Sequence, residues 1–236
     1  MALPKLNDTP KYDVVIPSTG QEVTFRPFLV KEQKVLLMAM ETNDQKQIIR
    51  GIVDTIEACI LDKIDVKRLT TFDLEYLFTR IRSKSAGETS TVFLQCGECD
   101  QRNEIKINLE EIQVHFEKKD EKIKLTDQYT LLMKYPQYDA LLMNIDESDK
   151  VSLTKSIFDL IMVCMDKLQT DEDQIDFKNE TKQEIEKFLG GLTSDQLELI
   201  MEWVRDLPKL THDIKFNCTS CKKENEITLQ GIQDFF

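Results

Sequence analysis

The chain has 236 residues, and its 31 Lys and Arg against 43 Asp and Glu give a net charge of −12. So acidic a surface repels phosphate backbones and anionic lipid headgroups, which disfavours nucleic-acid and membrane partners. The 41% of hydrophobic residues excludes a wholly disordered chain, and the small numbers of Gly (7) and Pro (6) favour helices over a many-turned β-sandwich.

The opening residues lack the apolar stretch of a secretory signal peptide. Without an export signal, the six cysteines are expected to lie in the reducing cytosol rather than in a disulfide framework.

The first half of the chain reads as a hairpin, helices and a second hairpin. Alternating residues at 13–16 and 22–25, around a Ser-Thr-Gly turn, predict two paired strands. Pro27 ends the second strand, and a short helix is expected after it. Apolar residues spaced by three and four from Ile48 to Ile60 predict a longer amphipathic helix, and Thr70 can cap a third. Strands at 91–95 and 104–109 are expected on either side of Cys96-Gly-Glu-Cys99.

The second half repeats this order. Strands are expected at 122–125 and 130–133, followed by a short helix after Pro136 and an apolar helical stripe from Ile157 to Leu168. Gly190-Gly191 predicts the end of a helix, and Thr193 can cap the next one. Strands at 213–217 and 226–229 are expected to flank Cys218-Thr-Ser-Cys221.

The matched order indicates an internal duplication. Both CxxC pairs and the Asn-Glu-Ile triplets that follow them are related by a shift of 122 residues. The expected class is therefore α+β, helix-dominated, with pseudo-twofold symmetry. We expect a first repeat at 1–116 and a second at 117–236, together forming one compact unit. An insertion near 171–187 is expected to project outside the core that the repeats have in common.

Two CxxC turns in equivalent contexts indicate a metal site. A CxxC turn between short strands directs two thiolates into one concave turn and so supplies half of a tetrahedral zinc site. We expect one structural Zn²⁺ per chain, shared between the copies and bound by Cys96, Cys99, Cys218 and Cys221. Two incomplete sites with other ligands, disulfides, and a thiol redox pair are the alternatives that the sequence leaves open.

No other group of residues indicates chemistry. Cys59 and Cys164 lie on apolar helix stripes and are expected to be small buried hydrophobes. His115 and His212 have no histidine at the equivalent position of the other copy, so neither is expected to bind metal. No P-loop, dinucleotide-binding glycine motif, Gly-x-Ser-x-Gly or His-Glu-x-x-His occurs, and a closed four-sulfur shell leaves no open metal position. We therefore expect no enzymatic activity.

Several segments share the pattern of one known family: residues 1–6 (Met-Ala-Leu-Pro-Lys-Leu), 17–20, 25–33, 71–78, 81–85 with Gly87-Glu88, and 133–136. In these segments the chain resembles the baseplate hub assembly proteins of T4-like contractile-tailed bacteriophages. The resemblance covers the first ninety residues well and the remainder more loosely. It implies a late viral protein, without enzymatic activity, that acts in the host cytoplasm to build the central baseplate hub, either as an assembly factor or as a retained hub component.

We accordingly expect a non-enzymatic adaptor or chaperone in viral tail assembly. It should bind other phage tail or baseplate hub proteins through apolar patches on an otherwise acidic shell. Candidate partner-binding residues are Phe25 and Phe28 near the first hairpin and Tyr135 and Tyr138 after the third predicted pair of strands. The alternative role of all four is to cover the core of their own repeat.

Two other functions remain open from the sequence. A zinc-ribbon accessory subunit of a nucleic-acid machine is favoured by Lys222-Lys223, but Glu98, Asp100 and Glu104 around the first CxxC turn disfavour contact with phosphate. A thiol redox enzyme requires a metal-free, reactive CxxC pair.

Overall fold

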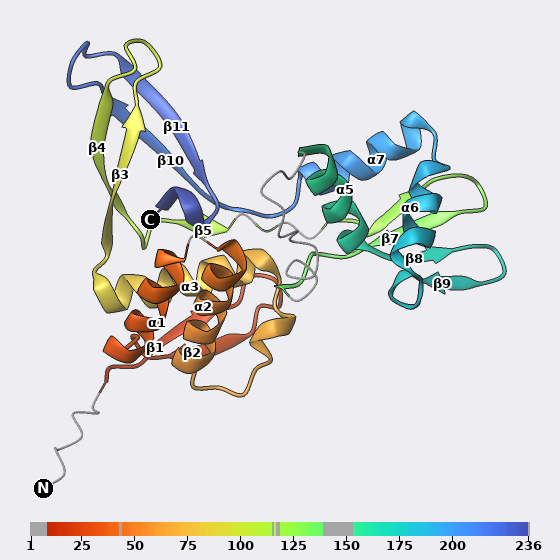
Figure 1. Cartoon of the computed structure of the whole chain (residues 1–236), viewed down its shortest axis with the longest axis horizontal. Helices are drawn as coiled ribbons and strands as arrows, with labels where there is room; N and C mark the ends of the chain where they lie inside the picture. The colour runs from red at the N-terminus through yellow and green to blue at the C-terminus, as the bar shows by residue number, and fades with distance from the viewer. Residues whose placement is uncertain (1–8, 43, 115, 117–118, 139–152, 236) are drawn as a thin grey trace, which may run out of the picture. The chain divides into compact units, whose positions relative to one another are not determined.

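The computed structural model describes residues 9–42, 44–114, 116, 119–138 and 153–235 (Figure 1). The chain forms two compact units, a first unit of residues 1–116 and 208–236 and a second unit of residues 117–207. Both contain helices and antiparallel strands, so the class is mixed α and β. The expected predominance of helix is not confirmed.

The first unit contains a short hairpin, helices and two longer hairpins. The short hairpin pairs β1 (Tyr12–Val15) with β2 (Glu22–Phe25), and the helices are α1 (Val30–Glu41), α2 (Gln45–Cys59) and α3 (Thr71–Ala86). In the longer hairpins β3 (Thr89–Gln95) pairs with β4 (Arg102–Asn108), and β10 (Leu210–Asn217) pairs with β11 (Glu224–Gln230) and with β5 (Gln113–Val114). The strands expected on both sides of each CxxC turn are confirmed.

Local sequence determines where the helices begin and which face they bury. The Thr70 hydroxyl accepts a hydrogen bond from the Asp73 amide (3.3 Å), and the Asp73 carboxylate accepts one from the Thr70 amide (3.1 Å). This capping box satisfies two amides that have no partner within α3. In α2 the expected apolar stripe is buried at Val53, Ile56 and Cys59. Both helix predictions are confirmed.

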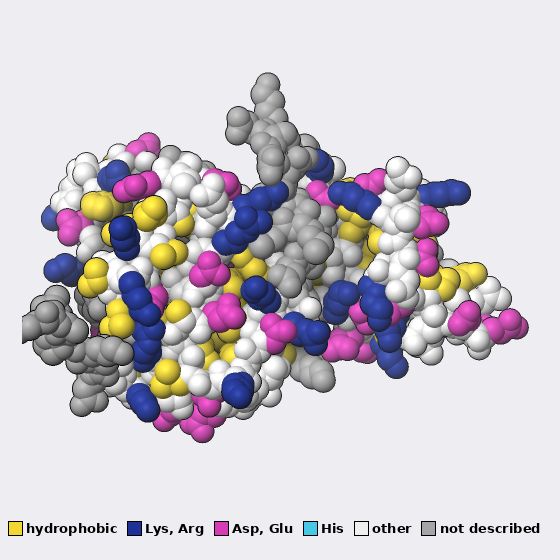
Figure 2. Space-filling view, turned by 60° about the horizontal axis from the view of Figure 1, so that its bottom comes forward, with side chains coloured by type: hydrophobic (Ala, Val, Ile, Leu, Met, Phe, Trp, Pro, Cys, Tyr) yellow, Lys and Arg dark blue, Asp and Glu magenta, His cyan; other side chains and the backbone are white. Residues whose placement is uncertain are grey.

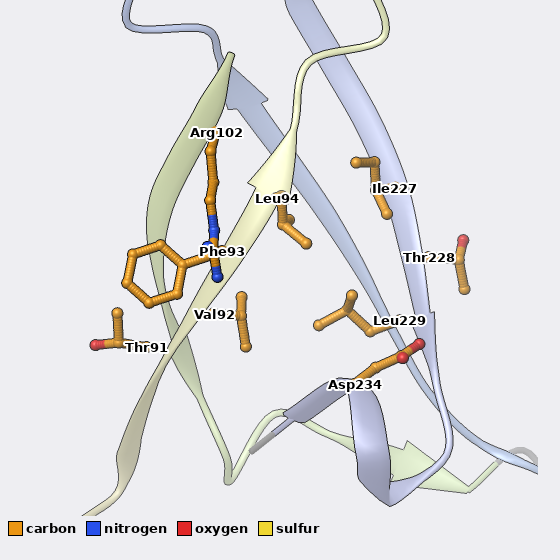
Figure 3. A pocket seen from close by; sticks show the side chains of 9 residues that line it. All are labelled: Thr91, Val92, Phe93, Leu94, Arg102, Ile227, Thr228, Leu229 and Asp234. Atoms are coloured by element: carbon orange, nitrogen blue, oxygen red, sulfur yellow. The ribbon is translucent and has the colours of Figure 1, made fainter. Parts of the chain in front are cut away.

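The two longer hairpins share one hydrophobic core, which brings the CxxC turns together. Alternate residues of a strand point to the same face, and here the inward-pointing residues include Val92 and Ile107 from one hairpin and Ile214 and Phe216 from the other. A pocket of about 480 Å³ opens between β3 and β11, and Val92, Leu94, Ile227 and Leu229 point into it (Figure 3). The C-terminal 3₁₀ turn (Ile232–Phe235) adds the fully buried Phe235 to the same core.

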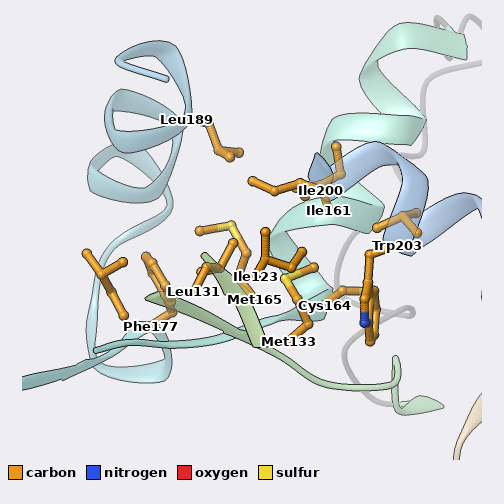
Figure 4. Packing of buried hydrophobic residues seen from close by; sticks show 12 residues of the cluster. Ile123, Leu131, Met133, Ile161, Cys164, Met165, Phe177, Leu189, Ile200 and Trp203 are labelled. Carbon is orange, nitrogen blue, oxygen red and sulfur yellow. The ribbon is translucent and has the colours of Figure 1, made fainter. Parts of the chain in front are cut away.

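The second unit is built on a four-stranded antiparallel sheet in the order β6-β7-β8-β9. Trp203 and its neighbours on the helices pack over buried sheet residues such as Leu131 and Met133 (Figure 4). The Trp203 indole donates a hydrogen bond to the Asp120 carbonyl (3.0 Å) and stacks on Tyr135. The elements are β6 (Lys122–Lys124), β7 (Thr130–Met133), α5 (Leu153–Cys164), β8 (Met165–Gln169), β9 (Gln174–Asp176), a 3₁₀ turn (Phe177–Asn179), α6 (Lys182–Gly190) and α7 (Ser194–Arg205).

One expectation for the second unit is wrong. The helical stripe ends at Cys164, and Met165 and Leu168 lie instead on β8, because β7 takes β8 as its second hydrogen-bonded neighbour. Within the segment 171–187, Phe177 is buried in the cluster that contains Leu131 and Trp203, and the insertion itself stays a prediction. The end of the helix was missed because β8 follows α5 directly, without a Gly, Pro or other turn residue that would mark the boundary in the sequence.

The two compact units have other bounds than the expected repeats, and the arrangement into repeats stays a prediction. Residues 208–236 belong to the first unit because β10 and β11 bury their apolar residues against β3, β4 and the turn after β4. The order of hairpin, helix, capped helix and CxxC hairpin does recur in the described residues. The helix expected after Pro136 falls mostly on residues 139–152, outside the described part of the chain. The duplication itself remains a prediction.

Candidate metal centre

The two CxxC turns have the same backbone geometry. The Cys96 amide donates to the Gln101 carbonyl (2.9 Å), and the Cys218 amide donates to the Lys223 carbonyl (2.8 Å). The residue after the second cysteine has a left-handed backbone in both turns, with φ of 55° at Asp100 and 62° at Lys222. Each turn therefore bends in the same way and directs its two sulfurs to one side.

All four sulfurs of the turns meet in one cluster within the first unit. The Sγ atoms of Cys96 and Cys221 are 3.6 Å apart, as are those of Cys99 and Cys218, and all four lie within 4.8 Å of one another. In a tetrahedral site with zinc–sulfur distances of 2.3 Å, the sulfurs are about 3.8 Å apart. The spacing therefore suits a four-sulfur metal site.

Hydrogen bonds from backbone amides lower the pKa of two of the sulfurs and so favour their thiolate form. Hydrogen bonds from the Cys221 and Ser220 amides lower the pKa of Cys218 to about 6. Those from the Glu98 and Cys99 amides lower the pKa of Cys96. At Cys99 the Gln101 amide acts in the same direction, but the sulfurs of Cys221, Cys218 and Cys96 outweigh it and raise its pKa to about 12. Without a cation the cluster therefore retains protons.

The chemistry of these donors fits a soft, tetrahedral cation. Four thiolates at this spacing repel one another, and a bound divalent ion removes that repulsion while replacing the protons. Four sulfurs also complete the coordination of zinc, which leaves no position for a substrate. None of the six cysteines forms a disulfide.

The other candidate ligands are not part of the cluster. Cys59 and Cys164 are buried apart from it, and burial raises their pKa values to about 11 and about 12. His212 lies on β10 but is not among the grouped metal-binding side chains, and His115 lies outside the described residues. The prediction that Cys59 is a buried apolar residue of α2 is confirmed.

The expected partner-binding aromatics lie mostly in their own cores. Phe25 is 2% exposed and Tyr138 is 4% exposed, whereas Phe28 and Tyr135 are half-buried. Tyr135 stacks on Trp203. Charge substitutions at Phe25 or Tyr138 should therefore disturb packing before they disturb any partner contact, and the binding role of all four residues stays a prediction.

The sequence did not assign a role to two asparagines beside the centre, Asn103 and Asn225. Each lies four residues after the second cysteine of its turn and contacts the opposite turn. Their repetition at the same spacing was visible in the Asn-Glu-Ile triplets, but a repeated polar residue does not indicate its partner.

The family of the chain follows from a match that spans both CxxC turns and both units. Residues 9–236 match the family described as T4 bacteriophage base plate protein. No curated protein and no solved structure matches the chain. No helix among the described residues is long and apolar enough to span a bilayer. The family match confirms the resemblance to T4-like baseplate proteins, and the chain therefore belongs to the T4 bacteriophage base plate protein family.

Proposed function

We propose that this chain is a non-enzymatic adaptor or chaperone of the phage tail that helps to build the central baseplate hub. The observation that carries the proposal is the family match over residues 9–236, which assigns a structural or assembly role in the baseplate. The protein acts in the host cytoplasm during assembly and enters the virion if it is retained in the hub. Its partners are other tail or baseplate proteins.

A single structural Zn²⁺ per chain is the second part of the proposal. Its ligands are Cys96, Cys99, Cys218 and Cys221, whose sulfur spacing suits a four-thiolate site. The ion fixes the tips of two hairpins that already share a core, and it holds no catalytic position. Elemental analysis of the purified monomer should give one zinc, and zero or two equivalents would refute this part.

An internal duplication accounts for the symmetry of the centre. A shift of 122 residues maps Cys96 onto Cys218 and Cys99 onto Cys221, so each of the two 3.6 Å sulfur pairs joins the first cysteine of one turn to the second cysteine of the other. The same shift maps the left-handed residue Asp100 onto the left-handed residue Lys222. We propose that each ancestral copy contributed one half of the metal site.

The surface proposed to bind a tail or baseplate protein is the outer face of α1. Large apolar side chains are exposed there, with Val30 at 80%, Met38 at 57% and Leu37 at 54%, and Val35 and Met40 are also exposed. On the face drawn in Figure 2, apolar side chains lie among both acidic and basic side chains, and neither sign of charge covers the face alone.

The sequence of α1 supports this choice of helix. Only Glu32 and Leu36 are buried among its residues, although apolar side chains surround its axis on almost every side. A helix that is apolar all round is ordinarily covered all round. Phe28, two residues before the start of α1, is half-buried.

Phage that carry Leu37→Asp with Met38→Asp test this surface. The variant chain should unfold at nearly the wild-type temperature, because both side chains are more than half exposed, yet fail to co-purify with hub proteins from infected cells. Leu199→Asp on α7 is the matched control, since Leu199 is also an exposed helical leucine (44%). Normal tails from the α1 variant, or an equal defect from the control, would refute the surface. Normal tails from a phage that lacks the protein would refute the assembly role.

A further inference from the structure

Two asparagine side chains cross between the CxxC turns. The carbonyl oxygen of Asn103, on β4, accepts hydrogen bonds from the amide (2.8 Å) and the hydroxyl (2.9 Å) of Thr219 in the opposite turn. The carbonyl oxygen of Asn225, on β11, accepts one from the Gly97 amide (3.0 Å) in the first turn. Thr219 and Gly97 are the residues directly after the first cysteines, so both asparagines bind the same place in the partner turn.

The side-chain amide nitrogens of the two asparagines also lie between the two turns. Nδ2 of Asn103 donates to its own turn at the Gln101 carbonyl (2.8 Å) and lies 3.8 Å from Sγ of Cys218. Nδ2 of Asn225 donates to the Lys223 carbonyl (2.9 Å) and lies 3.6 Å from Sγ of Cys96. An asparagine amide has two donor hydrogens and one acceptor oxygen, and here both donors and the oxygen have partners.

These contacts treat the four sulfurs unequally. Cys96 and Cys218 are buried and each has an asparagine donor from the other hairpin, whereas Cys99 and Cys221 are exposed. A donor beside a metal-bound thiolate withdraws charge from the sulfur and fixes its direction, which strengthens the site in the way that outer hydrogen bonds orient metal ligands.

We propose that Asn103 and Asn225 are reciprocal positioning residues, each of which holds the first cysteine of the opposite CxxC turn in place as a metal ligand. The proposal rests on the metal centre proposed above and extends it to a motif, Cys-x-x-Cys-x-x-x-Asn, that works only as a pair. Each asparagine contacts its own turn and also orients the first cysteine of the opposite turn for binding the ion.

The Asn→Asp change separates the role of the side-chain oxygen, which accepts hydrogen bonds, from the role of the side-chain nitrogen, which donates them. An aspartate at 103 or 225 keeps an oxygen for Thr219 or Gly97, but it loses the donor and places a negative charge against a thiolate. Asn217→Asp is the matched control, because Asn217 is exposed, adjoins Cys218 and adds the same charge near the centre. Asn103 is 1% exposed, so Asn225, which is half-buried, supplies the variant least prone to fold defects.

The experiment measures zinc transfer from the full-length chain to a chelator and the absorption of the Co²⁺-substituted chain. Asn103→Asp and Asn225→Asp should each release zinc about 10-fold faster or more, as is usual when an outer hydrogen bond to a ligand is lost. Their sulfur-to-cobalt bands should move to longer wavelength because the sulfur lone pairs are less stabilised. Asn217→Asp should change neither measurement by more than about twofold, a margin well inside that effect.

The outcomes separate this inference from the centre on which it rests. A wild-type chain that binds no zinc would remove the proposed centre itself. A wild-type chain with one zinc on four thiolates, together with Asn225→Asp that releases it at the wild-type rate with an unshifted cobalt band, would overturn only the positioning role. If Asn103→Asp does not fold, the result for Asn225→Asp decides.

Discussion

Removal of the metal should destabilise the first unit and leave the second unit unchanged. All four sulfurs belong to residues 1–116 and 208–236, so the ion binds only when that unit is folded. The second unit has its own core around Leu131 and Trp203, to which none of the four cysteines contributes. Chelation therefore removes a ligand from one of the two compact units.

The magnitude follows from linkage and from the size of the unit. A ligand that binds only the folded state at a free concentration 1,000 times its Kd contributes about 4.1 kcal/mol. A unit of roughly 150 residues shifts its melting temperature by about 2–4 °C per kcal/mol, so the first unit should lose roughly 8–16 °C. The difference in melting temperature between the zinc-bound and the chelated chain should increase with each tenfold rise in the free zinc concentration.

Each unit offers its own probe. Trp203 is the single tryptophan of the chain and is buried in the second unit, so its fluorescence reports that unit. Hydrogen exchange of peptides from β3 and β10 reports the first. After addition of a chelator, exchange in β3 and β10 should quicken while the tryptophan transition keeps its midpoint. An unmoved first unit would refute the energetic role of the metal, and an equal shift of both transitions would refute its confinement to one unit.

Three further results are expected. Cys96→Ser and Cys218→Ser should lower zinc occupancy and the melting temperature to a similar extent, because each leaves three sulfurs, whereas Cys59→Ala should cost about 1–3 kcal/mol in denaturant unfolding without loss of zinc. Iodoacetamide should label the exposed turn cysteines Cys99 and Cys221 after chelation but leave Cys59 and Cys164 unmodified until the chain unfolds, as mass spectrometry can show, because the reagent cannot reach these two buried thiols. Burial also raises the pKa of Glu75, so the free energy of unfolding should fall as pH rises from the ordinary glutamate pKa through the raised one. In denaturant titrations, Glu75→Gln should lose this dependence on pH. An unchanged dependence in the variant would assign it to other groups.

The grouping of the four cysteines was predictable because its pattern is both local and repeated. A CxxC turn between strands is recognisable from a few residues, and its second occurrence at a shift of 122 paired the two halves across the chain. The capped starts of α3 and α7 were equally local, since Thr70 and Thr193 each bind an amide three residues ahead. These features depend on neighbours in sequence, which the sequence displays directly.

Other features depend on distant partners and were missed for that reason. Met165 and Leu168 continue the helical spacing of α5, yet pairing with β7 makes them part of a strand. The reach of Asn103 to Thr219 spans 116 positions, and no short pattern reveals it. The buried positions of Phe25 and Tyr138 follow from which elements cover them, whereas their aromatic character alone suited either a core or a partner surface.

The second unit lies wholly within the stretch of chain between Cys99 and Cys218, and this has a consequence for the kinetics of folding. The entropy lost on closing a flexible loop rises with the logarithm of its length, and here roughly 120 residues separate the two halves of the site. The strands β6, β7, β8 and β9 pair in chain order, so the second unit is rich in local contacts that form early. Once that unit is folded, much of the intervening chain is no longer flexible when β10 must reach β5. A substitution that slows folding of residues 117–207 should therefore delay metal capture, even though it touches no ligand.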